Sequence, residues 1–222
     1  MVNNILAYGA KRLDFSEQLR YNEREICALS AICEVLMNMF AKITRSARQL
    51  GNTRTLTMAA LLVALNVALA SVRVQITPEL RLSIGFITQV TAGMLLGPAV
   101  AMLTGAAGDI VSLVCFPSGA YFPGYTLTAV VGGLIYGLML YERPRVGYLW
   151  ALLTKALVSL VCNVFLNTLW LMLTSGQAMA ALLPVRVLKN LGLLPFEALL
   201  LCMTASAVTL VMKRLHPRRT RD

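Results

Sequence analysis

A single acidic residue, Asp109, interrupts a long apolar part of the chain. From Leu82 to Tyr141 it is the only residue with an acidic or basic side chain. A carboxylate inside a membrane span is costly unless it is paired or functional, so Asp109 is a candidate ligand-binding group. Gly105, Ser112 and Phe116 share its helical face. A carboxylate held by a neighbouring helix, with no ligand, is the alternative interpretation.

Polar residues recur at helical spacing in a second apolar run, which has no charged residue from Ala156 to Val185. They are Ser159, Asn163, Asn167, Trp170 and Thr174. Polar groups on a membrane helix find partners inside the bundle, so this face is expected to point inward. It could hold helices together or, with the indole among its members, form one wall of a ligand site.

Two basic residues and an amide follow at spacings of i, i+3 and i+4: Arg186, Lys189 and Asn190. Glu197 lies two turns beyond Lys189 on the same face. Long basic side chains at the end of a span commonly extend to the interface. A cationic cluster at the mouth of a bundle also suits an anionic ligand group, and Arg81 in an earlier loop could add to it.

The sequence lacks the motifs of the common membrane and nucleotide-dependent enzymes. It has no GxxxxGK[ST] loop, so the chain by itself is not expected to hydrolyse ATP. HExxH and GxSxG are absent, the one histidine lies in a basic tail, and the five cysteines show no metal spacing. We therefore predict binding without catalysis, and no catalytic residue, metal or cofactor.

The composition indicates a membrane protein, so the candidate polar residues lie in or beside membrane-spanning segments. Only 14% of the 222 residues are charged, whereas a soluble domain carries roughly a quarter. The apolar runs and their proline and glycine boundaries predict an all-α integral membrane protein, a six-transmembrane-helix bundle. The predicted spans are Leu56–Val72, Leu82–Gly97, Ala99–Phe116, Tyr125–Tyr141, Tyr148–Thr174 and Pro184–Met212, the last with a kink at Pro195.

The basic residues that give the net charge of +10 flank the predicted spans. They precede the first span, follow the last, and include Arg143 and Arg145 in a loop on the same side. The positive-inside rule then predicts a multi-pass protein of the cell membrane with both termini cytoplasmic. Because the charges mark span ends, we expect no nucleic-acid partner.

The first fifty residues have a different pattern from the apolar runs that follow. Apolar residues recur there at spacings of three and four: Ile26, Leu29, Cys33, Leu36, Phe40, Ile43, Ala47 and Leu50. This pattern predicts an amphipathic helix on the membrane surface or against a partner. We predict an N-terminal cytoplasmic amphipathic extension (1–52), a membrane-embedded domain (53–215) and a basic cytoplasmic tail (216–222). A dispensable extension, or a translation start at Met37, Met39 or Met58, is the alternative.

Small residues recur at i, i+4 spacing in three predicted spans. They are Ala60, Ala64 and Ala68, then Gly93 and Gly97, then Gly133 and Gly137. Such patterns permit close contact between membrane helices.

Four segments, in consistent order, resemble the folate-specific S component of energy-coupling-factor vitamin transporters. They are ITPELRLSIGF (Ile76–Phe86), FPSGAYFPGYTLTAVVGGLIYG (Phe116–Gly137), NTLWL (Asn167–Leu171) and LLPVRVLKN (Leu182–Asn190). The resemblance covers about Asn52 to Met212 and leaves out the first fifty residues.

The resemblance implies that the membrane domain captures folate, or a related pterin, for uptake driven by a separate module. That module would comprise a transmembrane coupling protein and two cytoplasmic ATPases, in agreement with the missing P-loop. The family's docking motif maps onto Ala60, Ala64 and Ala68. Its pocket motifs map onto Arg81, Tyr121, Phe122, Asn167, Arg186, Lys189 and Asn190.

The chemistry of the implied ligand suits these residues. A pterin ring could stack on Tyr121, Phe122 or Trp170. Its donor edge suits a carboxylate such as Asp109, and the glutamate tail suits Arg186 and Lys189. Two other functions stay open, an S component for a different vitamin and a self-sufficient ion-coupled carrier. A carrier would more typically show internal repeats, which this sequence lacks.

Overall fold

The computed structural model describes residues 33–71, 74–77, 80–82, 85–116, 122–143, 146–175 and 179–215. The chain divides into two units, Met1–Ala41 and Lys42–Asp222. Of the first unit, residues 33–41 are described and are helical. In the second unit, residues 42–49 are helical and a turn leads to the remaining elements.

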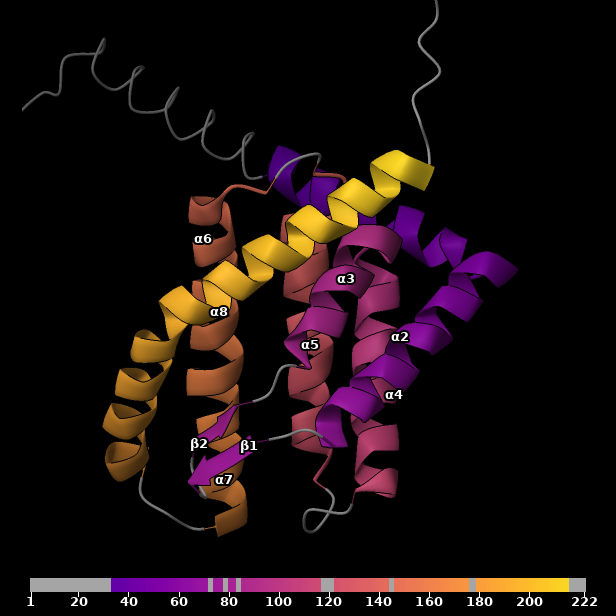
Figure 1. The fold of residues 1–222 in the computed structure, drawn as a ribbon. Helices are drawn as coiled ribbons and strands as arrows, with labels where there is room; N and C mark the ends of the chain where they lie inside the picture. The colour runs from indigo at the N-terminus through magenta and orange to yellow at the C-terminus, as the bar shows by residue number, and fades with distance from the viewer. Residues whose placement is uncertain are drawn as a thin grey trace, which may run out of the picture. The chain divides into compact units, whose positions relative to one another are not determined.

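The described part of the second unit is helical apart from one pair of short strands (Figure 1). After the turn its elements are α2 (Thr53–Ser71), β1 (Val74–Thr77), β2 (Leu80–Leu82), α3 (Phe86–Leu96), α4 (Pro98–Cys115), α5 (Pro123–Leu140), α6 (Tyr148–Val158), η1 (Ser159–Leu166), α7 (Asn167–Ser175) and α8 (Met179–Leu215). The segment η1 is a π-helix that joins α6 directly to α7. Pro184 and Pro195 lie inside α8.

Five helical segments among the described residues are long and apolar enough to cross a membrane. They are Thr53–Ala70, Pro98–Cys115, Pro123–Leu140, Tyr148–Thr174 and Val187–Arg214. Each overlaps one of the predicted spans, so the expected helical membrane architecture is confirmed. The remaining predicted span corresponds to α3, which has only 11 residues.

The predicted helix start at Leu82 was wrong, because Leu80–Leu82 forms a strand. It pairs antiparallel with β1, with Val74 opposite Leu82. The residue before a proline is biased toward extended conformations, which favours strand over helix at Thr77. The all-α description is corrected to this extent.

Small residues bring α3, α4 and α5 together. A Cβ on Gly133 would collide with the carbonyl group of Ala101, and one on Gly137 would collide with the backbone of Pro98. A Cβ on Gly93 would lie 2.9 Å from the amide nitrogen of Gly137. The predicted role of these glycines as close-contact points is therefore confirmed.

Gly97 separates α3 from α4. Its φ of 82° is a left-handed conformation that other residues rarely adopt. The break leaves terminal backbone groups without helical partners. Ser46, which is fully buried, satisfies two of them: its Oγ donates to the Leu96 carbonyl oxygen (2.7 Å) and accepts from the Val100 amide (3.3 Å).

Two more side chains attach residues 42–49 to the bundle. Arg45 forms an ion pair with Glu142 (2.6 Å), and Gln49 Nε2 donates to the hydroxyl of Tyr141 (3.2 Å). Both partners follow α5 directly. This segment therefore binds the junction of α3 and α4 and the end of α5 at once.

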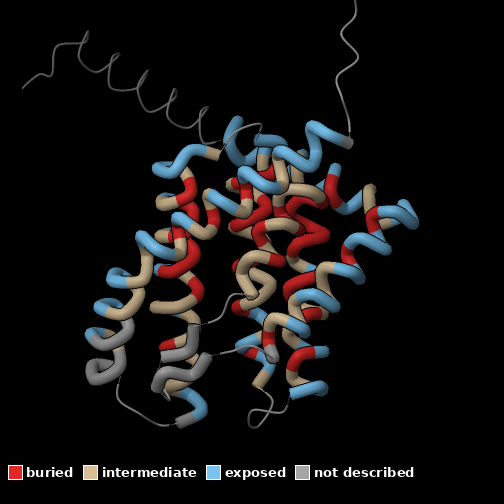
Figure 2. The backbone as a smooth tube through the Cα atoms, in the orientation of Figure 1, coloured by how far each residue is buried: buried red, intermediate tan, exposed pale blue. Residues whose placement is uncertain are grey.

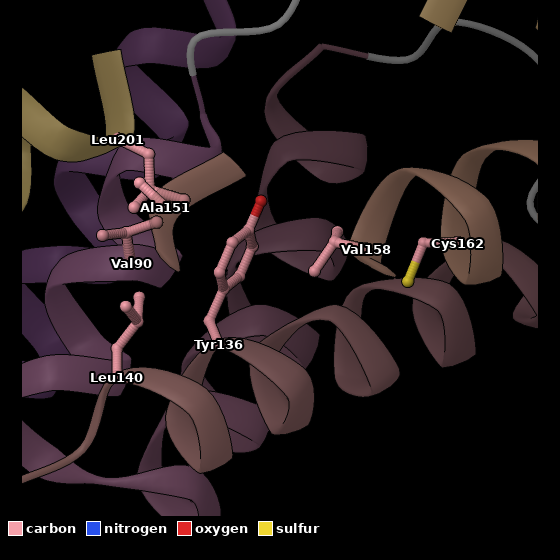
Figure 3. Close-up of a cluster of buried hydrophobic side chains, with 7 residues drawn as sticks. All are labelled: Val90, Tyr136, Leu140, Ala151, Val158, Cys162 and Leu201. Carbon is pink, nitrogen blue, oxygen red and sulfur yellow. The ribbon is translucent and has the colours of Figure 1, made fainter. Parts of the chain in front are cut away.

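The larger apolar cluster surrounds Tyr136 (Figure 3). Its members are Val90, Tyr136, Leu140, Ala151, Val158, Cys162 and Leu201. Figure 2 shows buried positions gathered where α3, α4 and α5 meet, with exposed positions along α2 and α8. Large apolar side chains such as Leu61 and Leu149 are exposed, which is typical of helices that face lipid.

Gly137→Ala should destabilise the protein, because the new methyl group has to displace the backbone of Pro98. Overpacking of this kind costs about 1–3 kcal/mol. The matched control is Gly192→Ala in α8, where the described structure places no atom within 4 Å of the added Cβ. Thermal unfolding of detergent-purified protein should show a lower midpoint for Gly137→Ala alone. Equal midpoints for the two variants would contradict this account of the helix crossing.

Candidate functional site

The described helices line an open cavity of about 710 Å³. Its lining on α5 runs from Tyr125 to Tyr136. Eleven residues of α-helix rise roughly 16 Å, so the cavity is elongated along the bundle. It is long enough for a ligand with distinct groups at its two ends.

The α4 wall carries Asp109. Its Oδ2 accepts a hydrogen bond from Thr126 Oγ1 (2.8 Å), and the carboxylate lines the cavity. Gly105 and Ser112 line it as well, as the shared helical face predicted. The Ser112 hydroxyl is buried and has no hydrogen-bond partner among the described residues. This wall therefore offers a carboxylate and a hydroxyl group to a ligand.

The wall formed by the fifth predicted span depends on the π-helical segment. Its lining residues are Lys155, Val158, Cys162, Asn163, Asn167 and Leu171. In an uninterrupted α-helix Asn167 would lie about 120° around the axis from Lys155, and Leu171 about 160°. A π-helical turn closes i→i+5 hydrogen bonds and so holds more residues than an α-turn. The segment η1 thus rotates α7 back toward the cavity.

The α8 wall contributes Lys189, Asn190 and Glu197. Asn163 Nδ2 donates to Asn190 Oδ1 (3.4 Å), which joins this wall to η1. Glu197 Oε2 lies 3.4 Å from Nζ of Lys155. The cavity is therefore lined by two carboxylates and two lysines, distributed over three helical segments.

The structure brings four of the predicted binding residues to the cavity, namely Asp109, Asn167, Lys189 and Asn190. Phe122 and Trp170 pack against each other beside it, with ring centroids 5.6 Å apart. The indole Nε1 donates to Oγ1 of Thr128, which does line the cavity (3.0 Å). Tyr121 and the side chains of Arg81 and Arg186 lie outside what the structure describes.

Sequence reasoning did not assign several lining residues. Lys155 is the clearest case, and its signal was a lone cation seven residues inside a long apolar span. Gln89 and Asn66 are amides inside other spans and also line the cavity. Tyr136 and Phe86 give no comparable signal, since aromatic residues in apolar runs are common.

The alanines of the predicted docking motif lie on the outer face of α2. Ala60, Ala64 and Ala68 are exposed, whereas Ala59 and Ala70 are buried. The motif therefore does not pack inside the bundle. Its small side chains form a flat surface that another helix could approach closely.

Comparison with known proteins finds relatives that are folate transporters. The chain is 37% identical over 125 residues to the folate transporter FolT of Clostridium novyi (strain NT), covering 56% of this chain and 72% of the relative. It is 30% identical over 151 residues to the folate transporter FolT of Leuconostoc mesenteroides, covering 66% and 81%. The folate transporter FolT of Streptococcus mutans is 27% identical over 153 residues, covering 61% and 82%.

Among solved structures, the crystal structure of FolT bound with folic acid superposes with a TM-score of 0.65 at 29% identity. It covers 70% of this chain and 95% of that chain. A family model described as the substrate-specific component of ECF transporters matches residues 54–205. With well over half of its length matched, this chain belongs to the family of substrate-specific components of ECF transporters.

Proposed function

We propose that this chain captures folate, or a related pterin, from outside the cell for ATP-driven uptake by a separate energising module. The observation that carries the proposal is a 710 Å³ cavity lined by two carboxylates and two lysines, in a chain that is similar to folate transporters. The module would supply a transmembrane coupling protein and two ATPases. The chain itself contributes binding and no catalytic step.

The elongated cavity suits a ligand with a flat polar ring at one end and an acidic tail at the other. Asp109 is our candidate for the donor edge of the pterin, because an ionised carboxylate accepts two hydrogen bonds side by side. Lys189 suits the tail carboxylates, and Arg186, one turn before it on α8, is the second candidate. Asn167 and Asn190 complete the polar lining.

The remaining proposed contacts come from aromatic and basic residues of the segments that resemble the family. Phe122 and Trp170 form an aromatic pair next to Thr128, a cavity residue, which supports a stacking role for this corner. Tyr121 and Arg81 belong to the same proposal through the resemblance of their segments to the family.

Wild-type protein in detergent should be stabilised by folate in preference to other vitamins, and Asp109→Asn should bind folate more weakly. The amide keeps the size and the contact with Thr126 but removes the charge. Loss of a charge-assisted hydrogen bond costs about 1.5–3 kcal/mol, roughly ten- to a hundredfold in Kd. A thermal-shift panel followed by ligand titration measures both.

The control is Glu34→Gln, the same chemical change at an exposed position outside the cavity lining, which should leave folate affinity unchanged. Wild-type protein that ignores folate but responds to another vitamin would overturn the substrate assignment. Unchanged folate affinity in Asp109→Asn would show that this carboxylate is structural, bonded by Thr126, and does not bind the ligand.

We also propose that α3 is the sixth crossing, so that both termini are cytoplasmic. The basic residues before α2, the loop after α5 and the basic tail then share one side. Reporter tags at the two termini of the protein in cells should both be protected from external protease or impermeant label. Labelling of either terminus from outside would disprove an even number of crossings.

The exposed alanines of α2 support a docking role, and Ala64→Trp tests it. On the exposed face the indole disturbs no internal packing, so stability and folate affinity should match wild type. It should block close approach of a coupling protein, so co-purification of the module and folate uptake should be lost.

The matched control is Ala59→Trp, one position away from Ala60 but packed in the cluster with Leu96 and Val100. Overpacking there should lower the free energy of unfolding by about 1–3 kcal/mol or more. Normal assembly and uptake by Ala64→Trp would contradict the docking role.

A further inference from the structure

Lys155 and Glu197 form an ion pair that the folate contacts proposed above leave unused. Lys155 Nζ lies 3.4 Å from Glu197 Oε2, and their side chains are 4% and 16% exposed. Both residues line the cavity and lie within membrane-length helices. Charged side chains at such depth are costly and commonly mark functional positions.

The contacts of the Lys155 ammonium are longer than those of a closed structural ion pair. Its hydrogen bond to the Tyr136 hydroxyl is 3.4 Å long, as is its separation from Glu197. Charge-assisted N–H···O bonds are typically 2.7–2.9 Å. The third contact is the face of the Phe86 ring, 3.8 Å from Nζ to the centroid. A lysine ammonium has three donors, and among the described residues two oxygen atoms lie near this one, so one donor remains for an acceptor in the cavity.

The surroundings indicate which kind of acceptor fits. Phe86 and Tyr136 also line the cavity, and Phe86 turns the face of its ring toward the ammonium whereas Tyr136 turns its hydroxyl toward it. A ligand carboxylate here would meet the charge of Glu197 and be repelled. A neutral carbonyl oxygen on a flat heterocycle would not be repelled, and its ring could pack against the Phe86 side chain.

We propose that Lys155 is a ligand-binding residue that donates a hydrogen bond to the ring carbonyl oxygen of a pterin. Glu197 is a positioning residue that holds the ammonium for this bond. The inference rests on the proposed function, because the pterin ring is the group in question.

A purely structural pair would hold α6 to α8 without touching ligand, and neutral replacement separates the two roles. Exchanging a buried ion pair for apolar residues of similar volume is often neutral for stability, whereas removing one partner leaves a costly unpaired charge. The informative variant is therefore the double substitution Lys155→Met/Glu197→Met in the full chain.

The experiment measures thermal unfolding without ligand, then the affinities for folate and for pteroic acid, which is folate without its glutamate tail. We expect the double variant to unfold near the wild-type midpoint. Its affinities for folate and pteroic acid should both fall by roughly ten- to a hundredfold, because the lost bond is to the shared ring.

The matched control is Arg45→Met/Glu142→Gln, which removes an exposed ion pair outside the cavity lining. Its ligand affinities should equal those of wild type. An equal loss in this control would overturn the proposal, because the effect would then not depend on the cavity.

Wild-type affinity in the cavity double variant would show that the pair is structural. A loss confined to folate would place the contact on the glutamate tail and also overturn the proposal.

If the double variant does not fold, Glu197→Asp decides the question. It keeps both charges but withdraws the carboxylate by one methylene, so both affinities should fall, and unchanged values would refute the role. Wild-type protein that binds neither ligand would overturn the proposed function, and this inference with it.

Discussion

A positive charge inside a membrane span must be paired by the protein, because the surrounding lipid offers it no partner. Lys155 imposes that requirement on this bundle. Phe86 of α3, Tyr136 of α5 and Glu197 of α8 converge on its ammonium from three other helices. Four helices therefore meet around one side chain at this part of the cavity.

Where α4 meets α5 at two glycines, close packing holds the helices together and, among the described residues, no buried charge is involved. There α4 and α5 approach through Gly133 and Gly137, where even a methyl group would collide with backbone. Dispersion and small side chains hold membrane helices together where no hydrophobic gain from leaving water exists. Because α4 and α5 also carry cavity residues such as Asp109 and Thr128, this close contact fixes one wall of the cavity.

The sequence could predict the site residues that are polar but lie in or beside apolar runs. Asp109, Asn167 and Lys189 were found because polar groups in or beside apolar runs need a reason to be there. The π-helical turn could not be predicted, because counting in steps of three and four assumes an unbroken α-helix. That assumption placed Trp170 on the cavity face, whereas Leu171 lines the cavity and the indole bonds to Thr128.

The strand at Leu80–Leu82 was missed for a related reason. Its apolar residues continue smoothly into α3, and only tertiary pairing with β1 distinguishes strand from helix there. Ser46 gave no signal at all, because a serine in an amphipathic pattern is unremarkable until its long-range partners are known.

Ser46 has a practical consequence for anyone who trims this protein for expression or crystallisation. The family model begins at residue 54, which invites removal of everything before it. Such a cut would strip the Leu96 carbonyl and the Val100 amide of their shared partner at a buried helix break. An orphaned buried backbone group costs about 1–3 kcal/mol. The N-terminal boundary of a shortened protein therefore belongs before residue 42, so that the short helix travels with the membrane domain.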